Sequence, residues 1–414
     1  MRRSQLFTKA FREPPSDEES TNARLLMQAG YVQKLMSGVY TFLPLGLLTL
    51  RKIENIVREE MNRIGGQEVL MPALHPIEHY EKTGRAAIED LFHTQLSTGS
   101  RFVLGQSHEE VVVPMVQKFI QSYRDLPLAV YQIQTKFRNE LRAKSGLFRG
   151  REFIMKDLYS FHSSEDDFES YYKKVQYAYR TIFSHVGIGE KTFLTYASGG
   201  TFSKISHEFQ TVAEAGEDII AICNYCHVAI NEQDRSLFPR CPECDQDPQE
   251  TKKSIEIANI FPLKTRYTDA FGLTVKNNAG EDQKVIMGCY GIGISRLMGA
   301  IAELYNDKNG LMLPKSVAPF SLYLIGLGKQ GGDEAEKLYA RLQKDDVSVL
   351  YDDRSDASAG EKFADADLLG IPQRVVVSEK TLAERLCEIK DRTTNVCSLV
   401  PLTDFINNMS LYVR

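Results

Sequence analysis

Apolar residues recur at helical spacing in two long stretches of the chain. In residues 45–64 they form one stripe, made of Leu50, Ile53, Ile56, Val57, Met61 and Ile64. Such a stripe predicts an amphipathic helix, and the glycine pair at 65–66 is typical of a helix end. Residues 165–187 predict a second helix, with Ser164 placed to cap its first turn and a glycine at its end.

Alternating apolar and polar residues predict strands at 101–107, 128–140 and 151–161, and a further strand at 67–74 is interrupted by Pro72. One face of the stretch 151–161 carries Phe153, Met155, Asp157, Tyr159 and Phe161. The last two strands are separated by a polar segment with glycines, so we expect a long antiparallel hairpin. Residues 210–285 are expected to form a loose middle segment. From residue 321 onward, strand and helix patterns alternate as β-α-β-α-β, which indicates a small α/β domain with a largely parallel sheet.

Composition narrows the class of protein. With 414 residues, the chain is too long for one hydrophobic core, so we expect two or three domains. No apolar run is long enough to span a membrane, and the basic N-terminus lacks the apolar core of a secretory signal. We expect a cytoplasmic protein, with a transit peptide as the weaker alternative. The net charge of -5 argues against indiscriminate nucleic-acid binding through bulk charge, although a local basic face remains compatible with it.

Four of the seven cysteines form two Cys-x2-Cys pairs that fourteen residues separate, namely Cys223, Cys226, Cys241 and Cys244. This spacing is typical of a four-thiolate zinc site, and a redox or coincidental origin is the alternative. Because four thiolates fill the coordination shell of Zn²⁺, we expect a structural ion.

The hairpin carries a concentration of charge. Residues 137–153 hold five basic residues and two glutamates. Arg138 and Glu140 share one strand face, as do Arg151 and Phe153. An arginine can hold a phosphate or carboxylate with two hydrogen bonds, a glutamate can accept from an exocyclic amine, and an aromatic ring can stack on a purine. A solvated hairpin with scattered charges is the competing interpretation.

A second element shifts the balance toward a nucleotide site. The stretch "GCYGIGISRL" brings three glycines in front of a helix whose first turn carries Arg296. An arginine at this place can reach a phosphate from another side. The stretch does not match the dinucleotide-binding fingerprint G-x-G-x-x-G, because Arg296 stands where the third glycine belongs. Together these residues predict a bent nucleotide on an antiparallel sheet.

Several stretches now resemble a known family. "GGQEVLMP", "FRNE…GLFRGREF" and "GCYGIGISR" are similar to motifs 1, 2 and 3 of class II aminoacyl-tRNA synthetases. "LMSGVYTFLPLG", "LGQSHEE", "YQIQTKFRNE", "REFIMKDLYSFH", "SHEF" and "APF" resemble bacterial-type prolyl-tRNA synthetases. The resemblance implies an α+β catalytic domain with an antiparallel sheet, a small zinc-knuckle insertion and a C-terminal α/β anticodon-binding domain. It also implies ligation of proline to tRNA(Pro) with ATP and Mg²⁺, and a homodimer with Pro72 at its interface.

The resemblance also implies roles for particular residues. Arg138 would hold the α-phosphate of ATP and the carboxylate of proline, and Arg296 the γ-phosphate. The other nucleotide and magnesium contacts would come from Glu140, Arg151, Phe153 and Glu208. Proline would meet Ser107, Glu109, Phe161, His162 and Cys289. A structural histidine at 162 and a packing cysteine at 289 are the plain alternatives. Ser107 stands where the family usually has threonine, and Phe202-Ser203 where it usually has two glycines.

The four segments expected are catalytic core at 1–210, a zinc knuckle at 211–255, core again at 256–313 and the anticodon-binding domain at 318–414. Many bacterial-type relatives carry an editing domain between motifs 2 and 3, for which residues 210–287 leave too little room. We therefore expect alanine mischarging without correction in cis, and a separate trans-editing protein as the partner that would correct it.

The C-terminal module offers Arg354 and Lys362 as tRNA contacts, with a solvated surface as an equal alternative. Two other functions compete with proline ligation. One is a different class IIa synthetase, against which "QSHEE" and "MKDLYSFH" speak. The other is a regulatory protein with this fold but no catalysis, against which the retained Arg138, Glu140 and Arg296 speak.

Overall fold

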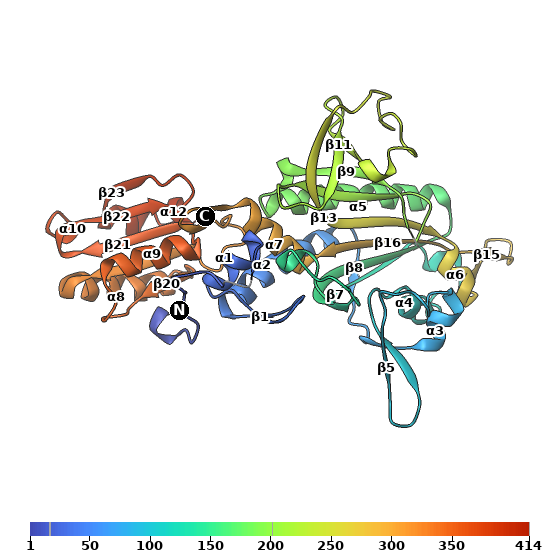
Figure 1. Cartoon of the computed structure of the whole chain (residues 1–414), viewed down its shortest axis with the longest axis horizontal. Coiled ribbons are helices and arrows are strands. Elements are labelled where there is room, and N and C mark those ends of the chain that lie inside the picture. The colour runs from blue at the N-terminus through green and yellow to red at the C-terminus, as the bar shows by residue number, and fades with distance from the viewer. Residues whose placement is uncertain (16–17, 201, 414) are drawn as a thin grey trace. The chain divides into compact units, whose positions relative to one another are not determined.

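The computed structural model describes residues 1–15, 18–200 and 202–413 (Figure 1). The chain divides into two compact units. The first comprises Met1–Leu35, Tyr40–Lys52 and Ile301–Arg414, and the second comprises Met36–Val39 and Ile53–Ala300. Helices α2 (Pro44–Arg63) and α7 (Ile294–Leu304) pass from one unit into the other. No helix among the described residues is long and apolar enough to cross a membrane.

The second unit is built on a nine-stranded sheet of order β10-β9-β12-β11-β13-β16-β8-β7-β3. Its strands are β3 (Gln67–Glu68), β7 (Leu128–Phe137), β8 (Glu152–His162), β9 (Thr192–Ala197), β10 (Ser206–Val212), β11 (Asp218–Ile222), β12 (Val228–Asn231), β13 (Glu250–Lys264) and β16 (Ile286–Gly293). All neighbours run antiparallel except β12–β9 and β3–β7. The predicted antiparallel sheet is thus confirmed.

The predicted hairpin is also present. Strands β7 and β8 pair from Leu128↔Phe161 to Phe137↔Glu152, and β16 pairs with the other edge of β8. The predicted strand at 67–74 ends early, after Glu68. Beyond Val69 the backbone hydrogen-bonds to a side chain of β7 in place of its backbone, since the Met71 amide donates to Gln132 Oε1 at 3.0 Å.

Helices and short strands cover this sheet. They are α3 (Ile77–Thr83), α4 (Glu109–Val116), α5 (Glu165–His185), α6 (Arg266–Phe271), a sheet of β4 (Leu74–Pro76), β6 (Arg101–Leu104) and β5 (Phe92–Gln95), and a hairpin of β14 (Thr274–Lys276) and β15 (Asp282–Lys284). The Ser164 hydroxyl accepts from the Asp167 amide at 3.3 Å, so the predicted cap of α5 is confirmed. The ring of Tyr172 on α5 packs 5.8 Å from Tyr290 of β16.

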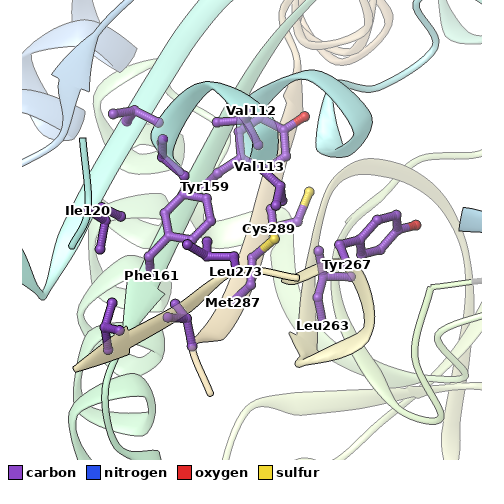
Figure 2. Packing of buried hydrophobic residues seen from close by; sticks show 14 of the residues in the cluster. Val112, Val113, Ile120, Tyr159, Phe161, Leu263, Tyr267, Leu273, Met287 and Cys289 are labelled. Carbon is purple, nitrogen blue, oxygen red and sulfur yellow. The ribbon is translucent and has the colours of Figure 1, made fainter. Parts of the chain in front are cut away.

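A buried apolar cluster lies where α4, β8, β16 and the loops beside α6 meet (Figure 2). Its members include Val112, Val113, Ile120, Tyr159, Phe161, Leu263, Tyr267, Leu273, Met287 and Cys289. Burial of such side chains stabilises the fold by about 25 cal/mol per Å². The cluster therefore gives β8 and β16 a rigid base on which polar side chains can be held.

The middle segment is a correction. Residues 210–285 are not loose, because β11, β12 and the long β13 continue the sheet. The apolar residues of β13 provide the reason, since Ile255, Ile257 and Ile260 are all buried. The longest stretch of this segment outside α-helices and strands lies between β12 and β13, and it holds a 3-10 turn at Glu232–Asp234.

The first unit contains a five-stranded sheet of order β20-β19-β21-β22-β23. Its elements are β19 (Leu322–Leu327), α8 (Gly328–Lys344), β20 (Val349–Asp352), α9 (Ala359–Leu369), β21 (Gln373–Ser378), α10 (Glu379–Ala383), β22 (Leu386–Asp391), β23 (Cys397–Pro401), α11 (Leu402–Asn407) and α12 (Ser410–Val413). Strands β20, β19 and β21 are parallel as predicted, while β22 and β23 add antiparallel strands. The remaining α-helices and strands of the described residues are α1 (Thr21–Gln28), β1 (Val32–Met36), β2 (Val39–Phe42), β17 (Asn306–Asp307) and β18 (Gly310–Leu311).

Candidate active site

The second unit encloses a cavity of about 240 Å³ above β8, β13 and β16. One end is lined by Arg138, Phe153, Glu256, Gly291, Gly293 and Arg296. The other end is lined by Arg85, Ser107, Glu109, Phe202, Phe261 and Cys289. Met155, Asp157 and Tyr159 of β8 lie between them. The two ends differ in chemistry, because one presents cations and the other a buried carboxylate beside apolar groups.

Two arginines dominate the first end. The guanidinium of Arg138 lies 5.2 Å from the centre of the Phe153 ring, and among the described residues no hydrogen bond or ion pair engages it. Burial, together with the positive charge of Arg296, lowers the pKa of Arg138. Arg296 is anchored, since its Nε donates to the Phe148 carbonyl at 2.8 Å and its Nη1 to the Glu256 carbonyl at 2.6 Å. A cation that is desolvated and repelled by its neighbour gains most from an anionic ligand.

Three residues predicted for the nucleotide or its magnesium do not line this cavity, namely Glu140, Arg151 and Glu208. Glu140 forms an ion pair with Arg149, Oε2 to Nε at 3.0 Å, and lines an adjoining hollow of about 200 Å³. Arg138 and Arg296 line that hollow too, so it continues the cation end. Arg151 donates from Nε to the Glu140 carbonyl at 2.9 Å and from Nη1 to the Ser37 carbonyl at 3.1 Å. In this structure its side chain therefore secures the hairpin loop.

A carboxylate pair lies beside the arginines. The amide of Asn259 is 3.5 Å from Glu208 Oε1 and 3.3 Å from Glu256 Oε1, so it bridges the two side chains. Burial and the charge of Glu256 raise the pKa of Glu208 to about 8. Carboxylate oxygens are the donors that Mg²⁺ prefers, and the pair fits such an ion. Glu256 was not predicted, and only its register beside β10 reveals it.

The second end centres on Glu109, which is fully buried at the start of α4. Its Oε1 lies 3.1 Å from the Cys289 sulfur, and its Oε2 lies 3.3 Å from Arg85 Nη1. The hydroxyl of Ser107 accepts from Arg85 Nη2 at 3.3 Å. Burial and the charge of Glu109 raise the pKa of Cys289, so this group stays a neutral thiol that donates to the carboxylate. A carboxylate held in this way can bind a compact cation.

Arg85 is the functional residue that sequence reasoning missed. Gly84 ends α3 at a φ of 74°, which turns the chain so that Arg85 enters the interior. Its Nη1 also lies 3.0 Å from Glu110 Oε1. The available signal in the sequence was the adjacent pair Glu109 and Glu110. Both carboxylates are buried in the structure, and two buried carboxylates require a cation. Their sequence alone did not indicate which arginine supplies it.

A buried polar network supports the turn before Glu109. Lys136 Nζ is 2.9 Å from Asp157 Oδ1 and 3.0 Å from His108 Nδ1. The backbone amide of His108 donates to the Tyr159 hydroxyl at 2.7 Å, and that hydroxyl donates to Asp157 Oδ2 at 2.8 Å. His108 Nε2 reaches the Pro72 carbonyl at 2.9 Å. Strands β7 and β8 thus hold α4 in place through charged groups that have no access to water.

Two residues predicted for proline are not among those that line the cavity. Phe161 is fully buried in the apolar cluster of Figure 2. His162 points to the opposite face of β8, and its Nδ1 lies 2.6 Å from Asp167 Oδ2 on α5. Burial lowers the pKa of His162. The strand runs past the cavity before reaching these positions, so both are placed for packing.

The four cysteines of the middle segment converge. Their sulfur atoms all lie within 4.8 Å of one another, with 3.4 Å between Cys223 and Cys244 and 3.3 Å between Cys226 and Cys241. A tetrahedral zinc site with Zn–S bonds of about 2.3 Å places sulfurs about 3.8 Å apart. Each Cys-x2-Cys pair is followed by a residue with a φ of 56°, His227 or Asp245. The amide of that residue donates a hydrogen bond to the carbonyl of the first cysteine of the pair. The donor set fits Zn²⁺.

In the first unit, both residues predicted for tRNA are engaged within the unit. Arg354 pairs with Asp352 at 2.6 Å and with Asp365 at 2.9 Å. Lys362 is buried and donates to the carbonyls of Gly326 and Asp352 at 3.3 and 3.2 Å. Their first role is to hold α9 against the sheet.

An antiparallel sheet that holds an arginine pair over a glycine-bearing strand, followed by a mixed α/β module, defines a class of protein. A family model of the tRNA synthetase class II core domain (G, H, P, S and T) matches residues 92–305, and a model of an anticodon-binding domain matches residues 321–410. The chain is therefore a class II aminoacyl-tRNA synthetase.

Curated relatives narrow the family. The proline–tRNA ligase of Dehalococcoides mccartyi is 31% identical over 567 residues, which cover 100% of this chain and 99% of that protein. The proline–tRNA ligase of Wolbachia pipientis wMel is 34% identical over 434 residues, which cover 99% of this chain and 100% of that protein. The chain belongs to the proline–tRNA ligase family, as its sequence motifs predicted.

Known structures agree on the fold. Giardia lamblia prolyl-tRNA synthetase in complex with prolyl-adenylate aligns with a TM-score of 0.76 at 21% identity, covering 92% of this chain and 74% of that one. The Cryptosporidium parvum enzyme complexed with L-proline and AMP aligns with a TM-score of 0.78 at 16% identity, covering 95% and 74%.

Proposed function

We propose that this chain activates L-proline with ATP to give prolyl-adenylate and transfers the prolyl group to the 3′ end of tRNA(Pro). The observation that carries this proposal is the cavity with two chemically distinct ends, in a chain of the proline–tRNA ligase family. The arginine end suits a polyphosphate. The Glu109 end suits the secondary ammonium of proline, with apolar side chains beside it.

The chemistry needs alignment more than proton transfer. The carboxylate of proline is already a nucleophile, so one of its oxygens attacks the α-phosphorus while the bond to pyrophosphate breaks. Arg138 is free to bind the two negative groups that approach each other, and Arg296 binds the phosphates that leave. Phe153 offers its ring to the adenine. A terminal hydroxyl of the tRNA then attacks the prolyl carbonyl, and AMP leaves.

Magnesium supplies charge neutralisation when it is bound. Glu208 and Glu256 are the residues that would hold it, because they are the paired carboxylates beside the arginines. Glu140 and Arg151 act through the hairpin loop, and we assign Glu140 to the adenine amine once that loop closes on ATP. Cys289 fixes the orientation of Glu109 directly and Ser107 does so through Arg85, and both residues would face the proline ring.

The cysteine site is proposed to hold a structural Zn²⁺. Few apolar side chains are buried between β12 and β13, Phe238 among them, so metal bonds would supply the stability that burial does not. On this assignment the catalytic core comprises 1–210 and 256–313, and the anticodon-binding domain comprises 318–414. Strands β10 and β13 support the division, because they pair directly on either side of the cysteine segment.

Editing in cis is proposed to be absent. The alignment to the Dehalococcoides relative runs over 567 residues, which exceeds the 414 residues of this chain by 153. The alignment to the Wolbachia relative runs over only 434. The chain thus lacks a domain-sized segment that one group of relatives has. On this proposal, correction of alanyl-tRNA requires a separate trans-editing protein.

A homodimer and a cytoplasmic location complete the proposal. Leu70 and Leu74, on either side of Pro72, leave 78% and 46% of their surface exposed, as expected of a contact face. Arg354 and Lys362 support the module proposed to bind tRNA through their contacts inside it.

The test is ATP–pyrophosphate exchange with each of the twenty amino acids in the absence of tRNA. Exchange strongest with proline, and weaker with alanine, supports the proposal. Exchange strongest with threonine or glycine points to another class IIa specificity. No exchange with any amino acid points to a synthetase-like regulatory protein.

A further inference from the structure

The apolar side of the Glu109 end is closed by an aromatic pair. The rings of Phe202 and Phe261 lie 4.7 Å apart at an interplanar angle of 31°, and both line the cavity. Phe261 is opposite Cys289 in the register of β13 and β16. Since Cys289 touches Glu109 at 3.1 Å, the apolar wall begins next to the carboxylate that accepts the ammonium.

Phe202 also has a polar attachment. The guanidinium of Arg85 lies 4.6 Å from the centre of its ring, while the same guanidinium pairs with Glu109. A cation over an aromatic face contributes about 0.5–2 kcal/mol. The position of the ring is thereby linked to the position of the carboxylate through a single buried side chain.

The backbone holds the ring in this place. The amide of Phe202 donates to the Gly199 carbonyl at 2.9 Å, and Arg266 Nη1 donates to the Phe202 carbonyl at 3.3 Å. A Cβ at Gly199 would lie 2.1 Å from the Ser203 hydroxyl, so this tight turn requires glycine. Phe202 is therefore fixed from three sides.

We propose that Phe202 is a specificity-determining residue, which selects proline over alanine by packing on the methylenes of the pyrrolidine ring. An amino acid whose ammonium sits on Glu109 must direct its side chain along the wall of Phe202, Phe261 and Cys289. Proline fills that space, whereas alanine leaves it empty. Because each methylene in an apolar pocket provides roughly 10- to 200-fold discrimination, such a wall suits a chain without an editing domain. The inference rests on the proposed function.

The test compares three proteins in pyrophosphate exchange, namely the unaltered chain, Phe202→Ala and Phe202→Leu. For Phe202→Ala we expect the KM for proline to rise about 10-fold or more, while the KM values for alanine and for ATP stay unchanged. Leucine keeps apolar volume, so Phe202→Leu is expected to retain most of the preference for proline. Phe119→Ala is the matched control, because that ring is 76% exposed.

A second substrate separates packing from a general disturbance of the site. Pipecolic acid carries one more ring methylene than proline, and truncation of Phe202 provides room for it. Its activity relative to proline is expected to rise in Phe202→Ala. An unchanged ratio of proline to alanine in this variant, or equal losses with proline, alanine and ATP, overturns the inference. If the unaltered chain shows no exchange with proline, the proposed function itself fails.

Discussion

The carboxylate of Glu109 and the thiol of Cys289 lie 3.1 Å apart, although 180 residues separate them in the chain. Glu109 is the first residue of α4, and Cys289 lies in β16, which follows the cysteine segment in the sequence. Strands β8 and β13, which flank β16, bring the two together. The Glu109 end of the cavity therefore forms only when the parts of the chain before and after the cysteine segment have packed against each other.

Arg138 is expected to act on the reaction without a role in stability. Its guanidinium has no ion-pair partner among the described residues, so Arg138→Ala should leave the melting temperature unchanged. Loss of a charged donor at the reacting phosphate should lower the rate of pyrophosphate exchange about 100- to 1,000-fold. Arg180→Ala, an exposed change on α5, is the control. Near-normal exchange by Arg138→Ala would show that another group aligns the carboxylate.

Arg85 is expected to be essential for folding stability. Arg85→Ala leaves Glu109 and Glu110 buried without a cation, which costs about 3–5 kcal/mol. Urea unfolding measures this loss. Adding Glu110→Gln should recover part of it, since one uncompensated charge is then gone. Arg101 pairs with Glu81 on the surface, so Arg101→Ala should cost less than about 1 kcal/mol. Equal losses for the two arginines would contradict the buried geometry.

The cysteine cluster is expected to bind one zinc ion per chain. Cys241→Ser should lower the zinc content measured by mass spectrometry and reduce Tm by about 4 °C or more, equivalent to about 1–2 kcal/mol. A chelator should produce the same shift in the unaltered protein. Cys397 is exposed and lies in the other unit, so Cys397→Ser should change neither value. Full zinc content in Cys241→Ser would disprove the four-cysteine site.

Stability is expected to fall between neutral and mildly acidic pH. Burial lowers the pKa of His75 from 6.5 to about 4, although the hydrogen bond of its ring to the Pro72 carbonyl acts in the opposite direction. The unfolded chain thus binds a proton at this residue below pH 6.5, whereas the folded chain does so only near pH 4. The stabilising contribution is complete above pH 6.5 and is lost on the way down to about 4.

The measurement for His75 is the free energy of unfolding in urea at pH 7 and pH 5. His75→Gln removes this titration, so its loss between the two values should be about 2 kcal/mol smaller than that of the unaltered chain. His93 is exposed, and His93→Gln should keep the original pH dependence. Identical slopes for His75→Gln and the unaltered chain would place the acid sensitivity elsewhere.

Alanyl-tRNA is expected to accumulate when the enzyme works alone. We expect the synthetic site to activate alanine at a reduced rate, and the length of the chain is consistent with the absence of an editing domain. Purified alanyl-tRNA(Pro) mixed with the enzyme should therefore deacylate no faster than in buffer. Enzyme-dependent hydrolysis at several times the buffer rate would mean that an editing site exists within these 414 residues.

Local patterns in the sequence were sufficient for the elements and the family. The stripe of α2, the cap of α5 at Ser164, the β7–β8 hairpin and the β-α-β alternation depend on near neighbours, whose spacing is visible along the chain. In the same way, the spacing of the two Cys-x2-Cys pairs was sufficient to predict that the four cysteines lie together. Arg138 and Arg296 could be predicted as ATP contacts because their motifs occupy continuous stretches.

Tertiary structure alone decided which groups meet. Arg85 and Phe202 lie in loops without periodicity, and Glu256 is one acidic residue among many until β13 pairs with β10 beside Glu208. Conversely, Phe161 and His162 belong to a suitable motif, but the strand carries them past the cavity into packed surroundings. Side-chain periodicity determines the face on which a residue lies. Which distant partner faces it depends on sheet order and loop closure, and these are set by packing of the whole unit.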